Sequence, residues 1–398
     1  MTGAEADSGS GPVIIGFADA LAAPETAWNL VENGFAVIAL VRRGTRTPLR
    51  WIRSVELEVV TSPRDDAQAC VNEVIQVAQK SGARTILPMD DDLVWVADRV
   101  GERIGLSPRP TGGVSDLALD KRKQLRLAES AGFSVPDTRY VDAPEDWPET
   151  VQLPVIVKPA MAAELTAGRL GRQGAVLCRD RSHLEHARRV VQPPLLIQPL
   201  IPGTGEGVFG LATDSGAVAV SGHERVRMMN PQGSGASACR SKEVDDELRS
   251  AAERFLKLAG WQGLFMIELL RAADGTCWFM ELNGRAWGSL ALANRRGFAY
   301  PAWTVQPAGA QLRPAPPRHP PALQARHIGR ELMHLAFVIR GPVAKPDPSW
   351  PRVGRTVRNL LSIHRGDRVY NWRRSAPLVL LSDTVRTLTS PLIGRRKS

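Results

Sequence analysis

The sequence lacks long apolar runs, paired cysteines and a recognisable secretory signal. No stretch approaches the roughly 18–20 apolar residues that a membrane-spanning helix needs. The four cysteines (Cys70, Cys178, Cys239 and Cys277) form no CxxC pair, so neither a zinc site nor a disulfide framework is indicated. The first residues, MTGAEADSGSG, lack the charged-then-apolar layout of a signal peptide. We therefore expect a soluble cytoplasmic protein.

Common catalytic and nucleotide-binding fingerprints are also missing. The turn after the first predicted strand has no GxGxxG, so a Rossmann dinucleotide site is not supported, and there is no Walker A pattern. A GxSxG elbow and a convincing Cys/His pair are absent as well. The sequence thus offers no obvious enzyme nucleophile.

The charge is unevenly distributed along the chain. The chain has 398 residues, 43% of them apolar, which is enough for two or three globular domains. Its net charge is +10, but residues 304–398 alone hold 17 Lys and Arg against 4 Asp and Glu. This basic quarter could contact acidic partners, nucleic acid or an anionic membrane surface, and a solvated basic surface is at least as good an interpretation.

The first hundred residues alternate between predicted strands and helices. Apolar runs are expected to form strands at 12–19, 35–41, 55–60 and 85–88, with helices at 24–34 and 67–80 between them. This alternation predicts a parallel, doubly wound sheet. Asp90, Asp91 and Asp92 follow the last strand, where open α/β sheets place ligands. A solvated helix N-cap is the favoured interpretation of this triplet, and substrate binding is the alternative.

The stretch from Gly263 to Ser289 carries the clearest chemical signal. Two apolar runs flank Ala273-Asp274-Gly275, which predicts a β-hairpin. Each arm contains one acid, Glu268 and Glu281, and a carboxylate in an apolar strand is costly unless it is paired or binds a cation. Asn283 shares a face with Glu281, and Arg285 follows. Two carboxylates and an amide oxygen suit Mg²⁺, while a hairpin with solvated acids is the alternative.

Basic residues and glycine-rich turns precede this hairpin. Lys121 begins a predicted helix, and Lys158 ends the apolar strand LPVIVKP, where a phosphate contact is expected. Residues 160–174 are predicted to form a mobile loop that closes over phosphates. Residues 195–200 form a further strand, and those after it a possible nucleotide hinge. Arg225 and Arg227 alternate on one strand and are candidates to bind a substrate carboxylate. A polar strand edge is an equal alternative, and His223 is expected to be a hydrogen-bonded strand residue rather than a base.

In this order the signals resemble the ATP-grasp superfamily, over residues 116–301. The matching stretches are LDKRKQLRLAESAGFSVPDT, LPVIVKP, IQPLIPGTGEGVFG, GLFMIEL and FMELNGRAWGSL, and the chain is most similar to a carboxylate–amine ligase-like branch ending in E-x-N-x-R-x-x-G-S. The resemblance implies that Lys121 and Lys158 contact the phosphates of ATP, and that Gln198, Pro199 and Leu200 form the adenine hinge. It implies Glu206 as the ribose ligand and Glu268, Glu281 and Asn283 as the metal ligands. Arg285 would be the cation at the transferred phosphate. Arg225 is the candidate for substrate binding. Many relatives have Glu where Gln198 stands, and the loop after Lys158 is not a clean glycine-rich motif.

The resemblance also implies an architecture and a reaction. We expect an α/β protein with an N-terminal doubly wound domain (1–115), an ATP-grasp domain whose two α+β subdomains clasp ATP (116–303, lid about 156–200) and a basic appendix (304–398). The implied activity is an ATP- and Mg²⁺-dependent ligase (with Mn²⁺ as an alternative metal) that activates a carboxylate as an acyl phosphate for an amine or thiol, producing ADP. The alternatives are phosphoryl transfer on the same fold and a non-catalytic ATP-binding module.

The partners expected from the sequence are mostly small molecules. They are a carboxylate and an amine, and no specific nucleic acid is expected. A dimer is plausible. Peripheral contact between the basic C-terminus and a membrane is left as an alternative. Residues 306–321 are rich in proline and predict an extended connector. Residues 328–339 have helical apolar spacing, and an apolar tail ends in Arg395-Arg396-Lys397. Packing of this appendix on the rest of the protein is the favoured interpretation.

Overall fold

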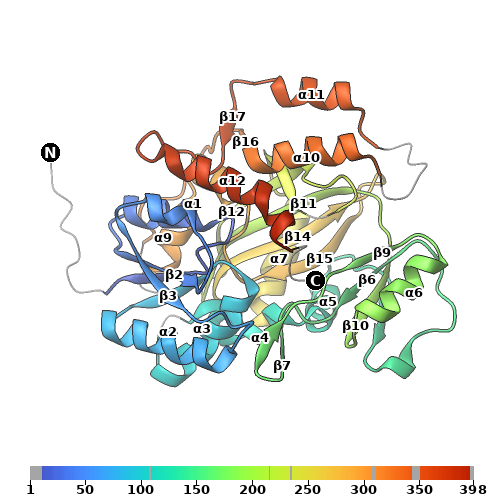
Figure 1. Cartoon of the computed structure of the whole chain (residues 1–398), viewed down its shortest axis with the longest axis horizontal. Coiled ribbons are helices and arrows are strands. Elements are labelled where there is room, and N and C mark those ends of the chain that lie inside the picture. The colour runs from blue at the N-terminus through green and yellow to red at the C-terminus, as the bar shows by residue number, and fades with distance from the viewer. Residues whose placement is uncertain are drawn as a thin grey trace.

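The N-terminal part is a four-stranded parallel sheet with helices on both faces (Figure 1). The computed structural model describes residues 11–106, 109–214, 216–233, 235–306, 311–342 and 350–394. The strand order is β3-β2-β1-β4, with β1 (Val13–Gly16), β2 (Val37–Arg42), β3 (Val55–Val60) and β4 (Thr85–Pro88). The helices are α1 (Ala23–Glu32), α2 (Ala67–Ser81) and α3 (Asp91–Ile104). Alternate strand residues are buried on opposite faces, Ile14 against α2 and α3, and Val13 on the side of α1. The predicted doubly wound sheet is confirmed.

A second sheet is antiparallel and lies to one side of the molecule. Its order is β5-β10-β6-β9, with β5 (Arg139–Val141), β6 (Val155–Pro159), β9 (Val176–Cys178) and β10 (Leu195–Pro199). Helix α6 (Arg181–Val190) covers one face, where Ala187 packs with Val157 and Leu195. The strand register puts Lys158, Leu196 and Gln198 on the opposite face. Lys158 therefore points away from the apolar cluster under α6.

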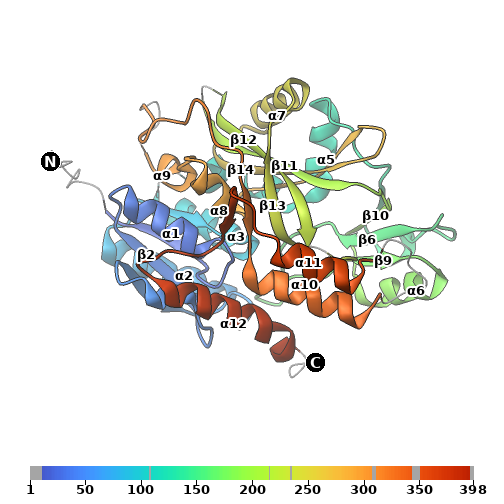
Figure 2. The same cartoon turned by 90° about the horizontal axis from the view of Figure 1, so that it is seen from above.

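The largest sheet has seven strands and forms the centre of the molecule (Figure 2). Its order is β15-β14-β11-β12-β13-β16-β17, with β11 (Thr204–Thr213), β12 (Gly216–Met228), β13 (Ala236–Lys242), β14 (Gly263–Arg271), β15 (Cys277–Asn283), β16 (Gln324–Arg326) and β17 (Asp367–Val369). One face packs Ile267 and Leu269 against α5 (Lys121–Ser130) and α7 (Asp246–Ala259). The other packs Phe209 and Met266 with Trp287 and part of the N-terminal core. The predicted hairpin is confirmed as β14 and β15, whose turn is closed by the Gly275 amide donating to the Ala272 carbonyl at 3.0 Å.

The C-terminal segment packs on the rest of the protein, as favoured from the sequence. Strands β16 and β17 extend the large sheet, and α10 (Ile328–Arg340) lies against β13. Helix α12 (Pro377–Gly394) contacts α10 and the short turn Pro48–Trp51 of the N-terminal part, where Val379 is buried (Figure 2). The other short helices are α4 (Ser115–Leu119), α8 (Leu290–Arg295), α9 (Tyr300–Thr304) and α11 (Val353–Leu361). Residues 307–310 of the predicted connector and Arg395-Arg396-Lys397 lie outside the described residues. Within the described ranges, no helix is long and apolar enough to cross a membrane.

Residues 160–174 differ from the predicted mobile loop. They contain a two-stranded hairpin, β7 (Glu164–Thr166) and β8 (Arg169–Gly171), that docks on the N-terminal part. The Ala67 amide donates to the Gly168 carbonyl at 2.9 Å, and the Leu170 amide donates to the Pro63 carbonyl at 2.8 Å. Leu170 is buried in the core beneath. The glycine content of this segment predicted a loop, but it does not show that Leu170 is buried in the N-terminal core.

The predicted division at 115/116 and 303/304 stays a prediction. The last part is not a separate appendix in one respect, because it supplies β16 and β17 to the same sheet as the middle part. The α/β character of the N-terminal part and the α+β character of the remainder agree with the expected fold class.

Helix α5 is fastened to β15 by one buried side chain, which gives a stability test. The Gln124 amide donates to the carbonyls of Leu117, Ala118 and Leu282 and accepts from the Leu282 amide at 2.9 Å. Gln124→Met keeps the length of the side chain but leaves buried backbone groups unsatisfied. We expect urea unfolding to show a loss of about 2–4 kcal/mol. The exposed Gln76→Met should change stability by less than about 0.5 kcal/mol, and equal effects would contradict this role of Gln124.

Candidate active site

The two acids of the hairpin lie directly opposite each other. Glu268 of β14 pairs with Glu281 of β15, and the register then shifts so that Leu269 pairs with Phe279. The extra residue at Met280 turns Phe279 into the core on one face and leaves Glu281 beside Glu268 on the other. The Asn283 side chain donates to Glu281 Oε1 at 3.2 Å, so the predicted metal-ligand trio is brought together.

Two lysines from other elements lie next to this acid pair. Lys121 Nζ is 3.7 Å from Glu281 Oε2. Burial lowers the pKa of Lys158, the Glu281 carboxylate opposes this shift and the positive charge of Lys121 adds to it, and together they bring this pKa to about 8. Burial alone would raise the pKa of Glu281, but the cations Lys121, Lys158 and Arg285 hold it below its usual range. The charged forms of these groups therefore depend on one another.

Local backbone bonds explain why the two lysines meet. Helix α5 begins at Lys121, and Asp120 caps it by accepting from the Arg122 amide at 2.9 Å. The Lys121 amide donates to the Ala160 carbonyl at 2.9 Å, which ties the start of the helix to the end of β6. Lys158 is two residues before Ala160, so both lysines are held at the same junction.

Arg285 is held by side-chain oxygens of two residues. Its Nε donates to Asp91 Oδ1 at 2.7 Å, and its Nη2 donates to Asn283 Oδ1 at 2.9 Å. Arg172, which follows β8, lies 3.7 Å from the other oxygen of Asp91. Asp91 thus connects the N-terminal part to the acid pair, and the only sequence signal for it was its position after β4.

The interpretation of the aspartate triplet as solvated is wrong for two of its members. Asp90 does cap α3, accepting from the Leu93 amide at 2.9 Å. Asp91 and Asp92 are only 7% and 2% exposed. Asp92 accepts from Arg42 at 3.1 Å and from Arg64 at 2.9 Å. These cations, which are distant in the sequence, make burial of the carboxylates acceptable.

Arg225 reaches the acid pair, but the expected pair of arginines does not form. Arg225 makes an ion pair with Glu268, and Arg227 makes one with Glu331 of α10. The register of β12 against β13 shifts between the two arginines, so simple alternation does not hold there. The simple alternation that suggested joint binding of one substrate carboxylate by Arg225 and Arg227 is therefore absent, and substrate binding by Arg225 stays a prediction.

His223 behaves as predicted. It is buried, and its Nδ1 shares a hydrogen bond of 2.8 Å with the Ser289 hydroxyl. Burial first, and then the charge of Arg225, lower its pKa to about 3. It is a hydrogen-bonded strand residue, and the proton affinity of its ring is too low for a base at neutral pH.

The predicted hinge shares a sheet face with Lys158. Gln198 is opposite Ile156, two residues before Lys158, and its amide donates to Thr138 Oγ1 at 2.7 Å. Gln198, Pro199 and Leu200 line a cavity of about 720 Å³ with residues 137–140 and 150–155. That lining includes neither lysine and neither hairpin acid. The hinge is thus a neighbour of Lys158 on the antiparallel four-stranded sheet, while Glu268 and Glu281 lie on the seven-stranded sheet.

Glu206, the predicted ribose ligand, is not brought to the other site residues. It lies on the face of β11 that carries Val208, and Glu268 lies on the opposite face of the sheet. Its carboxylate forms ion pairs with Lys242 and, at 2.9 Å, with Arg271. The neighbouring glycines face the acid pair instead. A Cβ at Gly205 would come within 2.6 Å of the Arg225 side chain, so the absence of a side chain there leaves room for this arginine.

Arg330 of α10 is a further candidate that the sequence did not single out. Its Nη1 donates to the Ala236 carbonyl at 3.0 Å. The same atom lies close to two glycines, since a Cβ would be 3.4 Å from it at Gly235 and 3.9 Å from it at Gly288. The structure gives it no ion pair with a carboxylate of the described chain, and burial lowers its pKa. Gly288 and Ser289 end the motif that contains Glu281, so Arg330 reaches the edge of the charged cluster. No motif surrounds it in the sequence.

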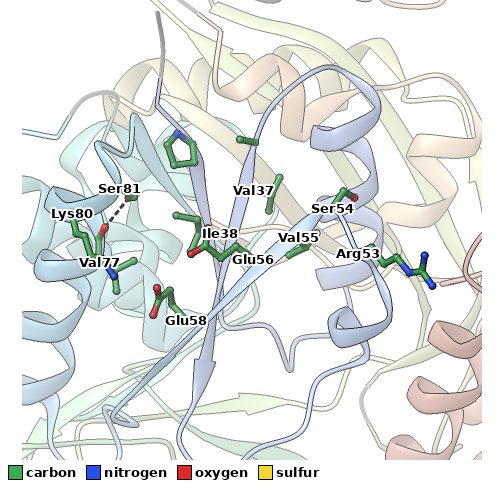
Figure 3. Close-up of a pocket in the computed structure, with 12 residues that line it drawn as sticks. Val37, Ile38, Arg53, Ser54, Val55, Glu56, Glu58, Val77, Lys80 and Ser81 are labelled. Carbon is green, nitrogen blue, oxygen red and sulfur yellow. Dashed lines mark hydrogen bonds between the residues drawn. The ribbon is translucent and has the colours of Figure 1, made fainter. Parts of the chain in front are cut away.

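A separate cavity of about 570 Å³ lies along the N-terminal sheet (Figure 3). It is lined by Val37 and Val55, which begin β2 and β3, and by Lys80 and Ser81 at the end of α2. This is the amino end of the parallel strands, whereas Asp91 follows the carboxyl end of β4. None of the predicted site residues lines it.

Comparison with solved structures relates the fold of the chain to those of known enzymes. No family model and no curated protein matches the chain. An L-amino acid ligase from Bacillus licheniformis matches with 18% identity and a TM-score of 0.59, covering 75% of this chain and 74% of that one. An ADP complex of N5-carboxyaminoimidazole ribonucleotide synthetase matches with 15% identity and a TM-score of 0.60, covering 88% and 96%. The biotin carboxylase domain of Hydrogenobacter thermophilus 2-oxoglutarate carboxylase, with MgADP and bicarbonate, matches with 15% identity and a TM-score of 0.57, covering 76% and 71%. At these identities the likeness concerns the fold.

The shifted pKa of Lys158 gives a direct test of the charge cluster. Because this pKa is about 8 rather than 10.5, an amine-specific acylating reagent should label Lys158 half-maximally near pH 8, as read by mass spectrometry, with exposed Lys257 as the internal reference. Glu281→Gln should move the midpoint to lower pH, because the Glu281 carboxylate raises the pKa of Lys158. A midpoint above pH 10, or no change in the variant, would contradict this arrangement.

Proposed function

The chain has the ATP-grasp fold, and we propose that it is an ATP-dependent ligase. It activates a carboxylate as an acyl phosphate for attack by an amine or thiol and releases ADP and phosphate. The observation that carries the proposal is the junction at which Lys121 and Lys158 meet the opposed acids Glu268 and Glu281. Neighbours named as a ligase, or solved with ADP or MgADP, support it.

The donor set of the hairpin fits a divalent metal. Glu268 and Glu281 present carboxylate oxygens from adjacent strands. The Asn283 amide donates to Glu281 through its nitrogen and accepts from Arg285 through its oxygen, and this oxygen would be its ligand to a metal. Mg²⁺ favours such hard oxygens, few in number, together with phosphate oxygens. These three residues would hold Mg²⁺, with Mn²⁺ as the alternative. When bound, the metal would supply charge neutralisation at the phosphates.

The cations of the site would bind and orient the nucleotide phosphates. Lys121 and Lys158 are placed to contact phosphate oxygens, and a phosphate anion would favour the charged form of Lys158, which burial disfavours. Arg285 is fixed by Asp91 and Asn283, so it can neutralise the transferred phosphoryl group without reorganising. The backbone of residues 198–200 would face the adenine edge. Glu206 stays the predicted ribose ligand, although it lies on the sheet face opposite to Glu268.

The reaction needs no enzyme nucleophile. A substrate carboxylate oxygen attacks the γ-phosphorus of ATP, and the bond from this phosphorus to the β–γ bridging oxygen breaks to release ADP. The amine nitrogen then forms a bond to the acyl carbon, phosphate leaves with the acyl oxygen, and the amine loses a proton. Electrostatic stabilisation of the phosphates is the main requirement of the first step, and the cations named above can provide it.

We further propose that Arg330 holds an anionic group of a substrate, a carboxylate or phosphate that does not itself react. A half-buried guanidinium without a carboxylate partner in the described chain is costly, and an anionic ligand would offset that cost. Arg225 already has Glu268 as its partner, so its catalytic role would be to hold that acid in place. Arg330 is thus better placed than Arg225 to bind such a group.

Release of ADP from Mg²⁺-ATP tests the proposed reaction. With pooled carboxylates and pooled amines, we expect ADP formation that requires both pools. Glu281→Gln should lower the rate by about 100-fold or more, since it removes charge from the metal-binding pair. Glu253→Gln, on the exposed side of α7, is the matched control and should keep the activity. Carboxylate-dependent turnover that ignores amines would favour phosphoryl transfer, and binding of ATP without turnover would favour a binding module.

Arg330 can be tested with any substrate pair that this assay identifies. Arg330→Gln should raise the KM for the anionic substrate about 10-fold to 100-fold, with little change in kcat or in the KM for ATP. With a neutral ester or amide of that substrate, wild type and Arg330→Gln should have the same KM. Arg340→Gln, at the exposed end of α10, serves as the control. Equal KM values for wild type and Arg330→Gln would exclude this role.

A further inference from the structure

The C-terminal quarter exposes an unusual amount of apolar surface. Eleven of the seventeen exposed large apolar side chains in the described chain lie between Leu332 and Leu388. The two most exposed are Ile363 at 82% and Leu361 at 75%. Exposed single apolar residues are ordinary, but a contiguous group usually marks an interaction surface.

Helix α11 and the turn after it contain the most exposed part of this surface. Val353, Val357 and Leu361 are spaced four residues apart and form one stripe along the helix, and Ile363 follows. Thr356 is the only buried residue of the helix. Figure 1 shows α11 outside α10, at the rim of the molecule. We call Val353, Val357, Leu361 and Ile363 the α11 stripe.

Arginines surround the α11 stripe. Arg352, Arg355, Arg358 and Arg365 are all exposed, and α11 itself contains no acidic residue. The structure gives these four arginines no ion pair with an acid of the described chain. Their long side chains can reach past a neighbouring apolar surface while keeping the charged end near water or headgroups. An apolar stripe with arginines on its flank is the pattern of a helix that lies in a membrane interface.

We propose that α11 and the following turn form a docking surface for a membrane containing anionic phospholipids. The apolar stripe would enter the region between headgroups and acyl chains, and the arginines would contact lipid phosphates. Charge complementarity favours this occupant over a second copy of the chain, because two copies joined through this face would bring their arginines together. Leu361 and Ile363 favour it over nucleic acid, since a phosphate backbone would leave these apolar side chains in water.

The proposal is independent of the ligase reaction and can be tested on the full chain. In vesicle sedimentation, we expect binding to phosphatidylcholine vesicles containing about one-third phosphatidylglycerol, and at least about tenfold weaker binding to phosphatidylcholine alone. Raising the salt to about 0.5 M should weaken binding, because it screens the arginines. The double substitution Leu361→Ser with Ile363→Ser should weaken binding by about tenfold or more.

Two further variants separate the contributions. Arg355→Gln with Arg358→Gln should remove the preference for anionic lipid, and Leu258→Ser is the apolar control, since Leu258 is 57% exposed on α7 outside the basic quarter. Loss of binding in Leu258→Ser, equal binding to both vesicle types, or no binding to either would overturn the proposal. A concentration-dependent dimer that Leu361→Ser with Ile363→Ser dissolves would also overturn it and identify the stripe as a self-association face. Circular dichroism of each variant checks the fold.

Discussion

The arrangement of the candidate site depends on one constraint, the placement of two carboxylates directly opposite each other. Like charges at paired positions of neighbouring strands repel, and both side chains sit in otherwise apolar strands. Glu268 and Glu281 therefore need cations, and four elements supply them: α5, β6, β12 and the segment after β15. The same cations make the pair suitable for phosphates and a metal. Stability of the hairpin and chemistry of the site thus follow from one set of charges.

Parts of the chain that lie outside the resemblance also contribute to this site. Asp91, from the N-terminal part, fixes Arg285, and Pro63 and Ala67 of the same part hold the hairpin β7–β8. From the other end of the chain, α10 supplies Glu331 to Arg227 and brings Arg330 near Gly288. In the proposed ligase, the large sheet would therefore join the nucleotide site on one part of its surface with residues that select a substrate. The C-terminal segment completes this sheet and also carries the α11 stripe.

The sequence was sufficient wherever a signal was local. The strand–helix alternation, the hairpin turn at Ala273–Gly275 and the capping role of Asp90 all depend on a few neighbouring residues, and these predictions are confirmed. The sequence predictions failed where the environment of a residue is determined by partners that are distant in the sequence. Burial of Asp92 depends on Arg42 and Arg64, the partners of Arg225 and Arg227 come from β14 and α10, and the docked hairpin depends on contacts with Pro63 and Ala67. The face on which Glu206 lies depends on strand register, which no local pattern specifies.

The most direct test of the central claim is calorimetric titration with a non-hydrolysable ATP analogue, with and without Mg²⁺. The charge cluster predicts binding that Mg²⁺ strengthens in the wild type. Lys158→Met should weaken binding by about tenfold or more, because it removes a cation from the phosphates, and Glu281→Gln should abolish the effect of Mg²⁺. Absence of nucleotide binding, or binding that neither substitution changes, would contradict the assignment of this junction as the ATP site.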